Sequence, residues 1–281
     1  MSGDSGNPEQ RAFWNEQAGP RWVTADDYVA AMLAPCSAAL FARAAIGTGE
    51  RVLDVGCGAG QTTVELAART GPSGRVVGLD VSAPLLERAR ARGEGLPQVS
   101  FLEADAQVHD LGDARFDAVV SRFGVMFFAD PVAAFTRLRG ACDRGGRLAF
   151  VCWRSVADNP WFAAPLRAMA RHVEPPPPPE PGAPGPFGLA DGPHIAEILA
   201  RAGWHRVVIE PIDVSLQVGR DPDDALRLAQ LLGATAAPLA QAEPAARDAA
   251  LSAVRSVYVE AHGPDGVHMP GAIWAVTASA G

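Results

Sequence analysis

Short apolar runs alternate with segments of helical periodicity through the middle of the chain, from about residue 51 to residue 153. The apolar runs have the length of buried strands and are predicted as strands at 51–55, 75–80, 99–103, 116–121 and 147–153. Helices are predicted between them at 61–70, 83–92 and 131–141. This alternation is typical of a parallel sheet with helices on both faces. Because such connections return with the same hand, we predict a doubly wound α/β fold.

Helical segments also precede this predicted core. Asn7 and Pro8 form a helix start, with Asn7 as the cap and Pro8 at the first helical position. A second helical stretch is predicted at 25–46, broken or kinked near Pro35, because proline cannot donate an interior helix hydrogen bond. We expect residues 1–46 to form a helical cover over a core at 47–155.

The remaining residues, 156–281, are expected to complete the sheet and to add helices. Strands are predicted at 206–218 and 271–278, and helices at 160–173, at 191–202 and beginning near 222 and 244. The result is a seven-stranded, mostly parallel sheet with helical insertions. A proline-rich segment at 174–188 cannot join a helix or a sheet, so we expect either a stiff linker or the edge of a lid.

The first predicted strand runs directly into a glycine-rich loop, in the sequence RVLDVGCGAG at 51–60. Glycines at 56, 58 and 60 allow backbone conformations that a Cβ forbids and let a ligand approach the backbone closely. Dinucleotide-binding folds place a further glycine after two intervening residues, where this chain has Gln61. The spacing therefore disfavours a nicotinamide cofactor.

Carboxylates stand at the ends of three successive predicted strands, as Asp54, Asp80 and Asp105. The carboxyl ends of parallel strands meet at one edge of a sheet, where ligands bind. A carboxylate offers two acceptor oxygens to the vicinal hydroxyls of a ribose. Any one of these acids is also compatible with an ordinary turn or cap, but three in register favour a nucleoside-sized ligand.

In these motifs the chain resembles the class I methyltransferases that use S-adenosylmethionine, over about residues 13–153. The nearest resemblance is to a small-molecule branch that includes quinone-biosynthesis enzymes. It implies that the glycine loop wraps the methionine and ribose part of the cofactor and that Asp80 binds the ribose hydroxyls. It also implies that Val81 packs on adenine, while Asp105 and Ala106 read the adenine edge.

The resemblance implies S-adenosyl-L-methionine as the cofactor and a Rossmann-like fold. The implied cofactor-binding residues are Trp14, Trp22, Asp54, Gly56, Cys57, Gly58, Gln61, Asp80, Val81, Asp105, Ala106, Ser121 and Arg122. Trp14 and Trp22 belong to the segment FWNEQAGPRWV, which resembles the amino-terminal cover of small-molecule enzymes. Both tryptophans either close over the sulfonium end of the cofactor or simply pack the cover onto the core.

Catalytic residues are not assigned by the sequence. Transfer of a methyl group from a sulfonium is an in-line displacement, in which a protein supplies alignment and a dry pocket. Arg122 either orients an anionic group or pairs with a neighbouring acid, and the second is the expectation. His109 and His172 are candidate bases, with His194 as a further one, although a solvated loop histidine explains His109 equally well.

Aromatic residues after the fourth and fifth strands predict an apolar or aromatic acceptor. The predicted pocket residues are Phe127, Phe128, Trp153, Trp161, Phe162 and Phe187. The alternative is that all of them belong to the core.

Charge and composition exclude several classes of partner. The net charge of -8 and the scattered basic residues disfavour nucleic acid. No apolar run approaches the about 20 residues needed to cross a bilayer, and the polar amino terminus is unlike a signal peptide. The four cysteines show no metal-binding spacing, so we expect free thiols, no metal and a cytoplasmic location. A homodimer is compatible with the helical insertion.

Together these features predict an enzyme that methylates a small, apolar or aromatic metabolite. The alternative is a protein that keeps the fold for cofactor binding or for chemistry other than methyl transfer. The acceptor, the methylated atom and the catalytic base are not specified by these motifs.

Overall fold

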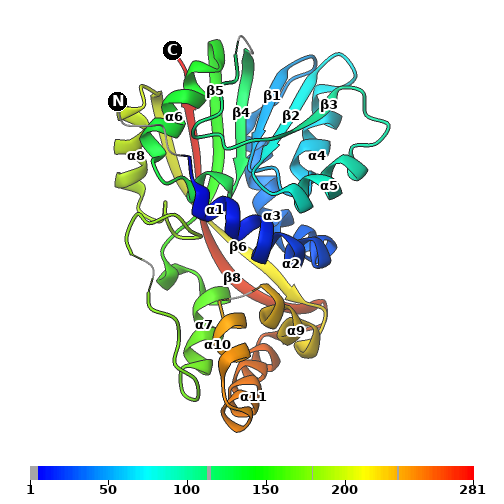
Figure 1. Cartoon of the computed structure of the whole chain (residues 1–281), viewed down its shortest axis with the longest axis vertical. Coiled ribbons are helices and arrows are strands. Elements are labelled where there is room, and N and C mark those ends of the chain that lie inside the picture. The colour runs from blue at the N-terminus through cyan, green and yellow to red at the C-terminus, as the bar shows by residue number, and fades with distance from the viewer. Residues whose placement is uncertain (1–5, 113–114, 179, 233) are drawn as a thin grey trace.

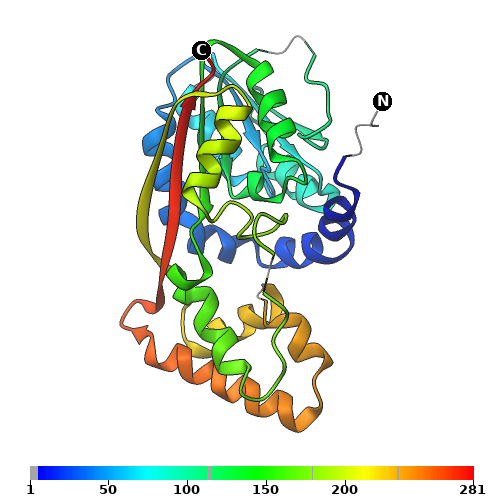
Figure 2. The same ribbon diagram turned by 90° about the vertical axis from the view of Figure 1, so that its left-hand side faces the viewer.

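The computed structural model describes residues 6–112, 115–178, 180–232 and 234–281. In this part of the chain, eight strands form one sheet, and seven of them lie side by side in the order β3-β2-β1-β4-β5-β8-β6 (Figure 1). Helices cover both faces of the sheet, which Figure 2 shows from the edge formed by β6. The predicted doubly wound, seven-stranded fold is confirmed, and a two-residue strand, β7 (His262–Gly263), is added beside β8.

The first five strands of the chain are parallel and lie side by side in the sheet. They are β1 (Arg51–Val55), β2 (Arg75–Asp80), β3 (Val99–Glu103), β4 (Phe116–Arg122) and β5 (Cys142–Trp153). The helices α4 (Gln61–Thr70), α5 (Ala83–Arg92) and α6 (Pro131–Gly140) connect them. The side chain of Asp130 caps α6 by accepting a hydrogen bond from the backbone N–H of Ala133 at 2.9 Å. The strand order reverses between β1 and β4, which is where doubly wound sheets bind ligands.

Two long antiparallel strands extend the sheet well beyond the parallel part. β6 (His205–Gly219) is the edge strand, and β8 (Gly266–Ser279) lies between β5 and β6. Their far ends reach a separate group of helices formed by α7 (Pro160–Met169), α9 (Pro222–Leu232), α10 (Ala236–Gln241) and α11 (Pro244–Glu260) (Figure 1). The helix α8 (Gly192–Arg201) packs on β6 nearer the core, and its Asp191 cap accepts from the N–H of His194.

The amino-terminal segment begins with α1 (Pro8–Ala12), a π-helical turn η1 (Phe13–Ala18) and α2 (Gly19–Thr24), and its residues 7–15 contact the carboxyl ends of the parallel strands. The next helix, α3 (Asp26–Ala44), packs on the sheet. Of the two alternatives expected near Pro35, a break or a kink, the break is wrong, because α3 continues through Pro35 as one helix. A helix tolerates an interior proline when packing offsets the lost hydrogen bond, and α3 is buried at Leu33, Cys36 and Leu40.

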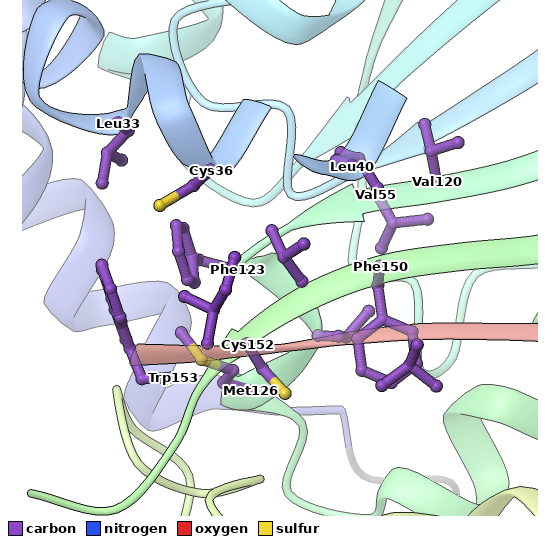
Figure 3. Packing of buried hydrophobic residues seen from close by; sticks show 14 of the residues in the cluster. Leu33, Cys36, Leu40, Val55, Val120, Phe123, Met126, Phe150, Cys152 and Trp153 are labelled. Carbon is purple, nitrogen blue, oxygen red and sulfur yellow. The ribbon is translucent and has the colours of Figure 1, made fainter. Parts of the chain in front are cut away.

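The main core lies between α3 and the sheet. Figure 3 shows Phe123, which follows β4, between Cys36 of α3 and Trp153 at the end of β5. Phe123 adopts a left-handed backbone conformation with φ of 67°, which is uncommon for a residue with a side chain. Its ring is 8% exposed and stacks on Trp153 at 4.3 Å between ring centroids. Burial of this ring pair holds the corner that follows β4 in a fixed shape.

Candidate functional site

The glycine loop after β1 lies against the corner after β4. Gly56, Gly58 and Gly60 have φ values of 68°, 54° and 79°, a region that L side chains rarely adopt. A Cβ built on Gly56 would lie 2.5 Å from the Cα of Gly124, so this glycine allows the two corners to touch. A Cβ built on Gly58 would have no atom within 4 Å. Gly58 therefore faces open space at the carboxyl edge of the sheet, where a ligand has room to approach.

Asp80, at the end of β2, holds this loop in place. Its Oδ2 accepts a hydrogen bond from the backbone N–H of Gly58 at 2.8 Å, and its Oδ1 accepts from that of Ser82 at 2.9 Å. Burial raises the pKa of Asp80, while these backbone hydrogen bonds favour its ionised form. The side chain is only 9% exposed, but each carboxylate oxygen retains acceptor capacity beyond its one bond.

Asp54 lies deeper, at the end of β1, and is completely buried. Its Oδ2 accepts hydrogen bonds from the hydroxyls of Thr62 and Thr63, each at 2.6 Å, which fixes the first turn of α4. Its Oδ1 is buried with no hydrogen-bond partner among the described residues. Burial raises the pKa of Asp54, opposed by the two threonine hydroxyls and by the charge of Arg122. An unpartnered buried oxygen is costly, so a ligand donor at Oδ1 would be favourable.

Asp105, after β3, is covered by the amino-terminal segment. Its Oδ2 accepts from the backbone N–H of Asn7 at 2.7 Å, and its Oδ1 accepts from that of Gln107 at 2.9 Å. The Asn7 side chain donates to the carbonyl of Phe127 at 2.6 Å. The amino-terminal segment therefore bridges the ends of β3 and β4, and Ala106 is buried beside it.

Arg122, the last residue of β4, does not pair with a neighbouring acid as expected. Its guanidinium donates to the Ser37 hydroxyl at 2.8 Å and to Gln61 Oε1 at 3.3 Å. Among the described residues it forms no ion pair with a carboxylate. Burial lowers the pKa of Arg122, while the charge of Asp54 opposes that shift. Ser37 is a contact that sequence reasoning missed, because a serine inside a helix carries no signal of its partner.

The amino-terminal cover contacts the residues after β2 directly. The Asn15 side chain donates to the carbonyl of Val81 and accepts from the N–H of Ala83, both at 2.9 Å. The Ser82 hydroxyl donates to the Trp14 carbonyl at 2.9 Å, so its side chain does not cap α5, although Ser82 occupies the N-cap position. Asn15 was missed because an asparagine beside two tryptophans gives no indication of its distant partner.

The rings of the cover pack against the corner after β4. Trp14 meets Trp22 and Phe127 edge to face, with ring centroids 5.5 Å and 5.4 Å apart. Both tryptophans are partly exposed, so packing and ligand contact are both open to them.

Two other residues implied by the resemblance have their side chains occupied within the protein. The Ser121 hydroxyl is buried, donates to the Val55 carbonyl at 2.7 Å and accepts from the N–H of Gly124 at 3.1 Å. Cys57 is buried against β2, where a Cβ on Gly78 would lie 2.9 Å from its sulfur. Both side chains stabilise the shape of the loop.

Four of the six predicted pocket residues form a row of rings. Trp153 lies 4.8 Å from Trp161, Trp161 lies 5.7 Å from Phe162, and Phe162 lies 4.8 Å from Phe187. The row begins beside Phe123 and ends in the proline-rich segment. The other two residues lie apart from the row: Phe127 packs on Trp14, and Phe128 packs on the buried ring of Phe135.

The candidate bases are not brought together. His109 is half-buried after β3, and its backbone N–H donates to the Asp105 carbonyl at 2.8 Å. His172 is exposed just beyond α7, and His194 is in the first turn of α8.

The four free cysteines are all buried, and burial raises the pKa of Cys36 to about 12. Among the described residues, no cluster of acids, histidines or cysteines suits a metal ion, and no helix combines the length and apolarity of a membrane span.

Comparisons with known proteins point to one family. Residues 52–146 match the family model described as a methyltransferase domain. The chain is 39% identical to aklanonic acid methyltransferase DauC of Streptomyces sp. (strain C5) over 105 residues, which is 37% of this chain and 48% of that protein. It is 40% identical over 124 residues to an uncharacterized protein of Mycobacterium tuberculosis, covering 43% of this chain and 44% of the relative. The chain therefore matches less than half the length of both relatives.

Solved structures share the fold at lower identity. A putative methyltransferase from Bacillus halodurans matches with a TM-score of 0.55 and 18% identity, over 87% of this chain and 98% of that one. The [4+2]-cyclase SpnF matches with a TM-score of 0.53 and 22% identity, over 87% of this chain and 80% of that one. At these identities the similarity establishes the fold alone.

Proposed function

We propose that the chain is a class I S-adenosylmethionine-dependent methyltransferase, which transfers a methyl group from S-adenosylmethionine to a small acceptor; the match of residues 52–146 to a methyltransferase domain supports this. The single observation that carries the proposal is the arrangement of Asp54, Asp80 and Asp105 around a glycine loop with open space at Gly58. The carboxylates lie at or just after the ends of three neighbouring strands, which places them along one edge of the sheet.

The residues present fit this cofactor chemically. Asp80 and Asp105 are acceptors at the strand ends, and the ribose hydroxyls and the adenine amino group of the cofactor are donors. Deeper in the site, Asp54 Oδ1 is an unpartnered acceptor and Arg122 is a cation held by neutral partners. The methionine part of the cofactor carries an ammonium, which can donate to Asp54 Oδ1, and a carboxylate, which can pair with the Arg122 guanidinium. We therefore assign Asp54 and Arg122 to the methionine end.

When bound, S-adenosylmethionine supplies an activated methyl group on its sulfonium. The protein's own contribution is alignment and exclusion of water. The cover contributes Trp14, whose ring packs on Phe127 and whose carbonyl accepts from Ser82. Aromatic faces and carbonyls are favourable neighbours for a sulfonium cation. No histidine is assigned as a base.

The row of rings from Trp153 to Phe187 supports a planar aromatic acceptor. Rings stack on flat ligands with little loss of rotamer entropy, and Trp161, Phe162 and Phe187 are all partly exposed. The proline-rich segment carries the end of the row, and the Gly185 N–H donates to the Met126 carbonyl at 3.1 Å. We therefore propose that this segment is the edge of a lid over the acceptor. A relative named as an aklanonic acid methyltransferase supports a small-molecule acceptor by analogy.

A second candidate function keeps the cofactor site but uses it for other chemistry. A protein named as a [4+2]-cyclase shares this fold. The two candidates differ in one observable outcome. A methyltransferase moves labelled methyl from S-adenosylmethionine to an acceptor, whereas the alternative binds the cofactor and leaves its methyl group in place.

The test uses purified protein, S-adenosylmethionine with a labelled methyl group and a panel of polycyclic phenols, with simple aliphatic amines and acids as controls. We expect label in at least one polycyclic product and none in the aliphatic compounds. Label in an aliphatic control would overturn the acceptor class. Cofactor binding without transfer to any compound, including metabolite extracts, would favour the second candidate.

A further inference from the structure

The glycine loop is held from outside the site by an arginine of α5. Ala89 and Arg92, one helical turn apart, lie on the face of α5 that meets the loop. A Cβ built on Gly60 would lie 2.9 Å from the Cβ of Ala89, so helix and loop are in direct contact. The Arg92 Nη1 donates to the carbonyl of Ala59, which lies between Gly58 and Gly60.

The same guanidinium also binds the start of α3. Arg92 Nη2 donates to Asp26 Oδ2 at 2.7 Å, and Arg88 Nε donates to the same oxygen at 2.8 Å. The Asp26 side chain is 7% exposed and that of Arg92 is 19% exposed, whereas that of Arg88 is 43% exposed. The Asp26–Arg92 pair is thus the more shielded of the two, and only Arg92 continues to the loop.

Asp26 is the first residue of α3 and follows the cover helix α2 after a single residue, Ala25. The contacts therefore run from the junction of the cover helices α2 and α3, where Asp26 lies, through Arg92 to the backbone of the glycine loop. At the other end of the loop, α3 reaches Gln61 through Ser37 and Arg122. α3 is linked to both ends of the loop, but Arg92 is the link that lies outside the proposed cofactor site.

We propose that Arg92 is a positioning residue, which fixes the Ala59 carbonyl and so couples the glycine loop to the cover through Asp26. A loop of left-handed glycines has little conformational preference of its own, so external contacts must select its bound shape. Arg92 supplies two donors in a rigid fork, one to the loop and one to Asp26. The consequence for the cofactor rests on the proposed function, whereas the link between loop and cover does not.

The experiment compares Arg92→Ala with Arg88→Ala as the matched control. Both variants remove a cation from Asp26, but only Arg92 contacts the loop. In ligand-free protein we expect faster amide hydrogen exchange at residues 58–61 in Arg92→Ala, and wild-type exchange there in Arg88→Ala. Arg92→Lys, which keeps the charge but lacks the fork, should be intermediate and guards against loss of folding.

Binding of S-adenosylhomocysteine, the demethylated product, gives the second measurement. A lost charge-assisted hydrogen bond that orients the loop should raise the Kd of Arg92→Ala by at least about tenfold, and that of Arg88→Ala by less than about twofold. Asp26→Asn combined with Arg92→Ala should add little to Arg92→Ala alone, because both act through one link.

Equal loop exchange in Arg92→Ala and wild type would overturn the proposal, as would an equal effect of Arg88→Ala. If wild-type protein fails to bind the product, the proposed function fails, but the exchange measurement still decides whether Arg92 positions the loop.

Discussion

The backbone N–H of Asn7 donates a hydrogen bond to Asp105 Oδ2 at 2.7 Å, joining residues 98 positions apart. A Cβ built on Gly6 would lie 3.0 Å from the same oxygen. The amino-terminal segment is therefore seated on the carboxylate to which we assign adenine recognition. Under the proposed function, the cover and the cofactor share this acceptor, so the position of one should affect the binding of the other.

Asp105→Ala should loosen the cover and weaken product binding together. Removal of the acceptor leaves the Asn7 N–H without its partner, so amide exchange should rise across residues 8–18. The affinity for S-adenosylhomocysteine should fall by about 1–2 kcal/mol. Asp110→Ala is the control, because Asp110 lies in the same loop and, among the described residues, accepts a hydrogen bond from the N–H of Gly112 alone. Unchanged exchange in the cover of Asp105→Ala would contradict the shared role.

Two glycines of one loop should respond differently to substitution by alanine. The added methyl group of Gly58→Ala would meet open space, so the free energy of unfolding should fall only by the about 1–2 kcal/mol that a left-handed alanine costs. The same substitution should nevertheless weaken product binding by at least about tenfold. Gly56→Ala adds a backbone clash with Gly124 and should lose about 3 kcal/mol or more of stability. Chemical denaturation and product titration measure the two effects. Normal product affinity in a folded Gly58→Ala protein would mean that the ligand lies elsewhere.

Arg122→Met should discriminate between two adenosine thioethers. S-adenosylhomocysteine carries the amino-acid carboxylate that we assign to Arg122, whereas 5′-methylthioadenosine lacks it. We expect the Kd of the first to rise by at least about tenfold and that of the second to change by less than about twofold, since a charge-assisted bond is lost only for the first. Equal weakening of both ligands would indicate that Arg122 acts on the fold of the site and not on the carboxylate.

Asp54→Asn should change the pH dependence of stability. Burial raises the pKa of Asp54 in the folded protein, so its ionisation opposes folding. The stability that it contributes is present below the unfolded pKa of about 3.9 and is lost as pH rises through the folded pKa. The free energy of unfolding of Asp54→Asn minus that of wild type should therefore increase as pH rises from about 4 toward neutrality. A difference that stays constant with pH, or decreases, would contradict the raised pKa.

Most strands and helices of the parallel half were predictable because their patterns are local. The bounds of β1, β2, β3, α4 and α5 agree with the apolar runs and helical segments predicted from the sequence. β5 begins at Cys142, earlier than expected, because DRGGR at 143–147 has no strand pattern of its own. Cys142 pairs with Phe116 and Arg147 with Ala118 of β4, with an irregularity in the register between them. The short helix α10 and the two-residue strand β7 were missed for the same reason: tertiary contacts stabilise both.

The side-chain roles were only partly predictable. Spacing after strands indicated Asp80 and Asp105, since parallel strands bring their ends together. It did not indicate that Asp54 binds two threonines, that Arg122 binds Ser37, or that Phe128 packs on Phe135. Those contacts depend on which helix face meets which strand, and a residue's type does not encode its distant partner. Arg92 is the clearest case, because a basic residue in the last turn of a helix ordinarily indicates only a favourable helix dipole.

The central claim is that the carboxyl ends of the parallel strands bind an adenosine-bearing cofactor, with Asp80 accepting hydrogen bonds from its ribose. Titration calorimetry of S-adenosylhomocysteine into wild-type protein and Asp80→Ala tests it most directly, with circular dichroism to verify that both are folded. We predict one product molecule bound per wild-type chain, and an affinity for Asp80→Ala that is weaker by about 1.5–3 kcal/mol because the ribose loses a charged acceptor. Equal affinity in a folded Asp80→Ala protein, or a wild-type protein that binds a nicotinamide dinucleotide and not the product, would contradict the claim.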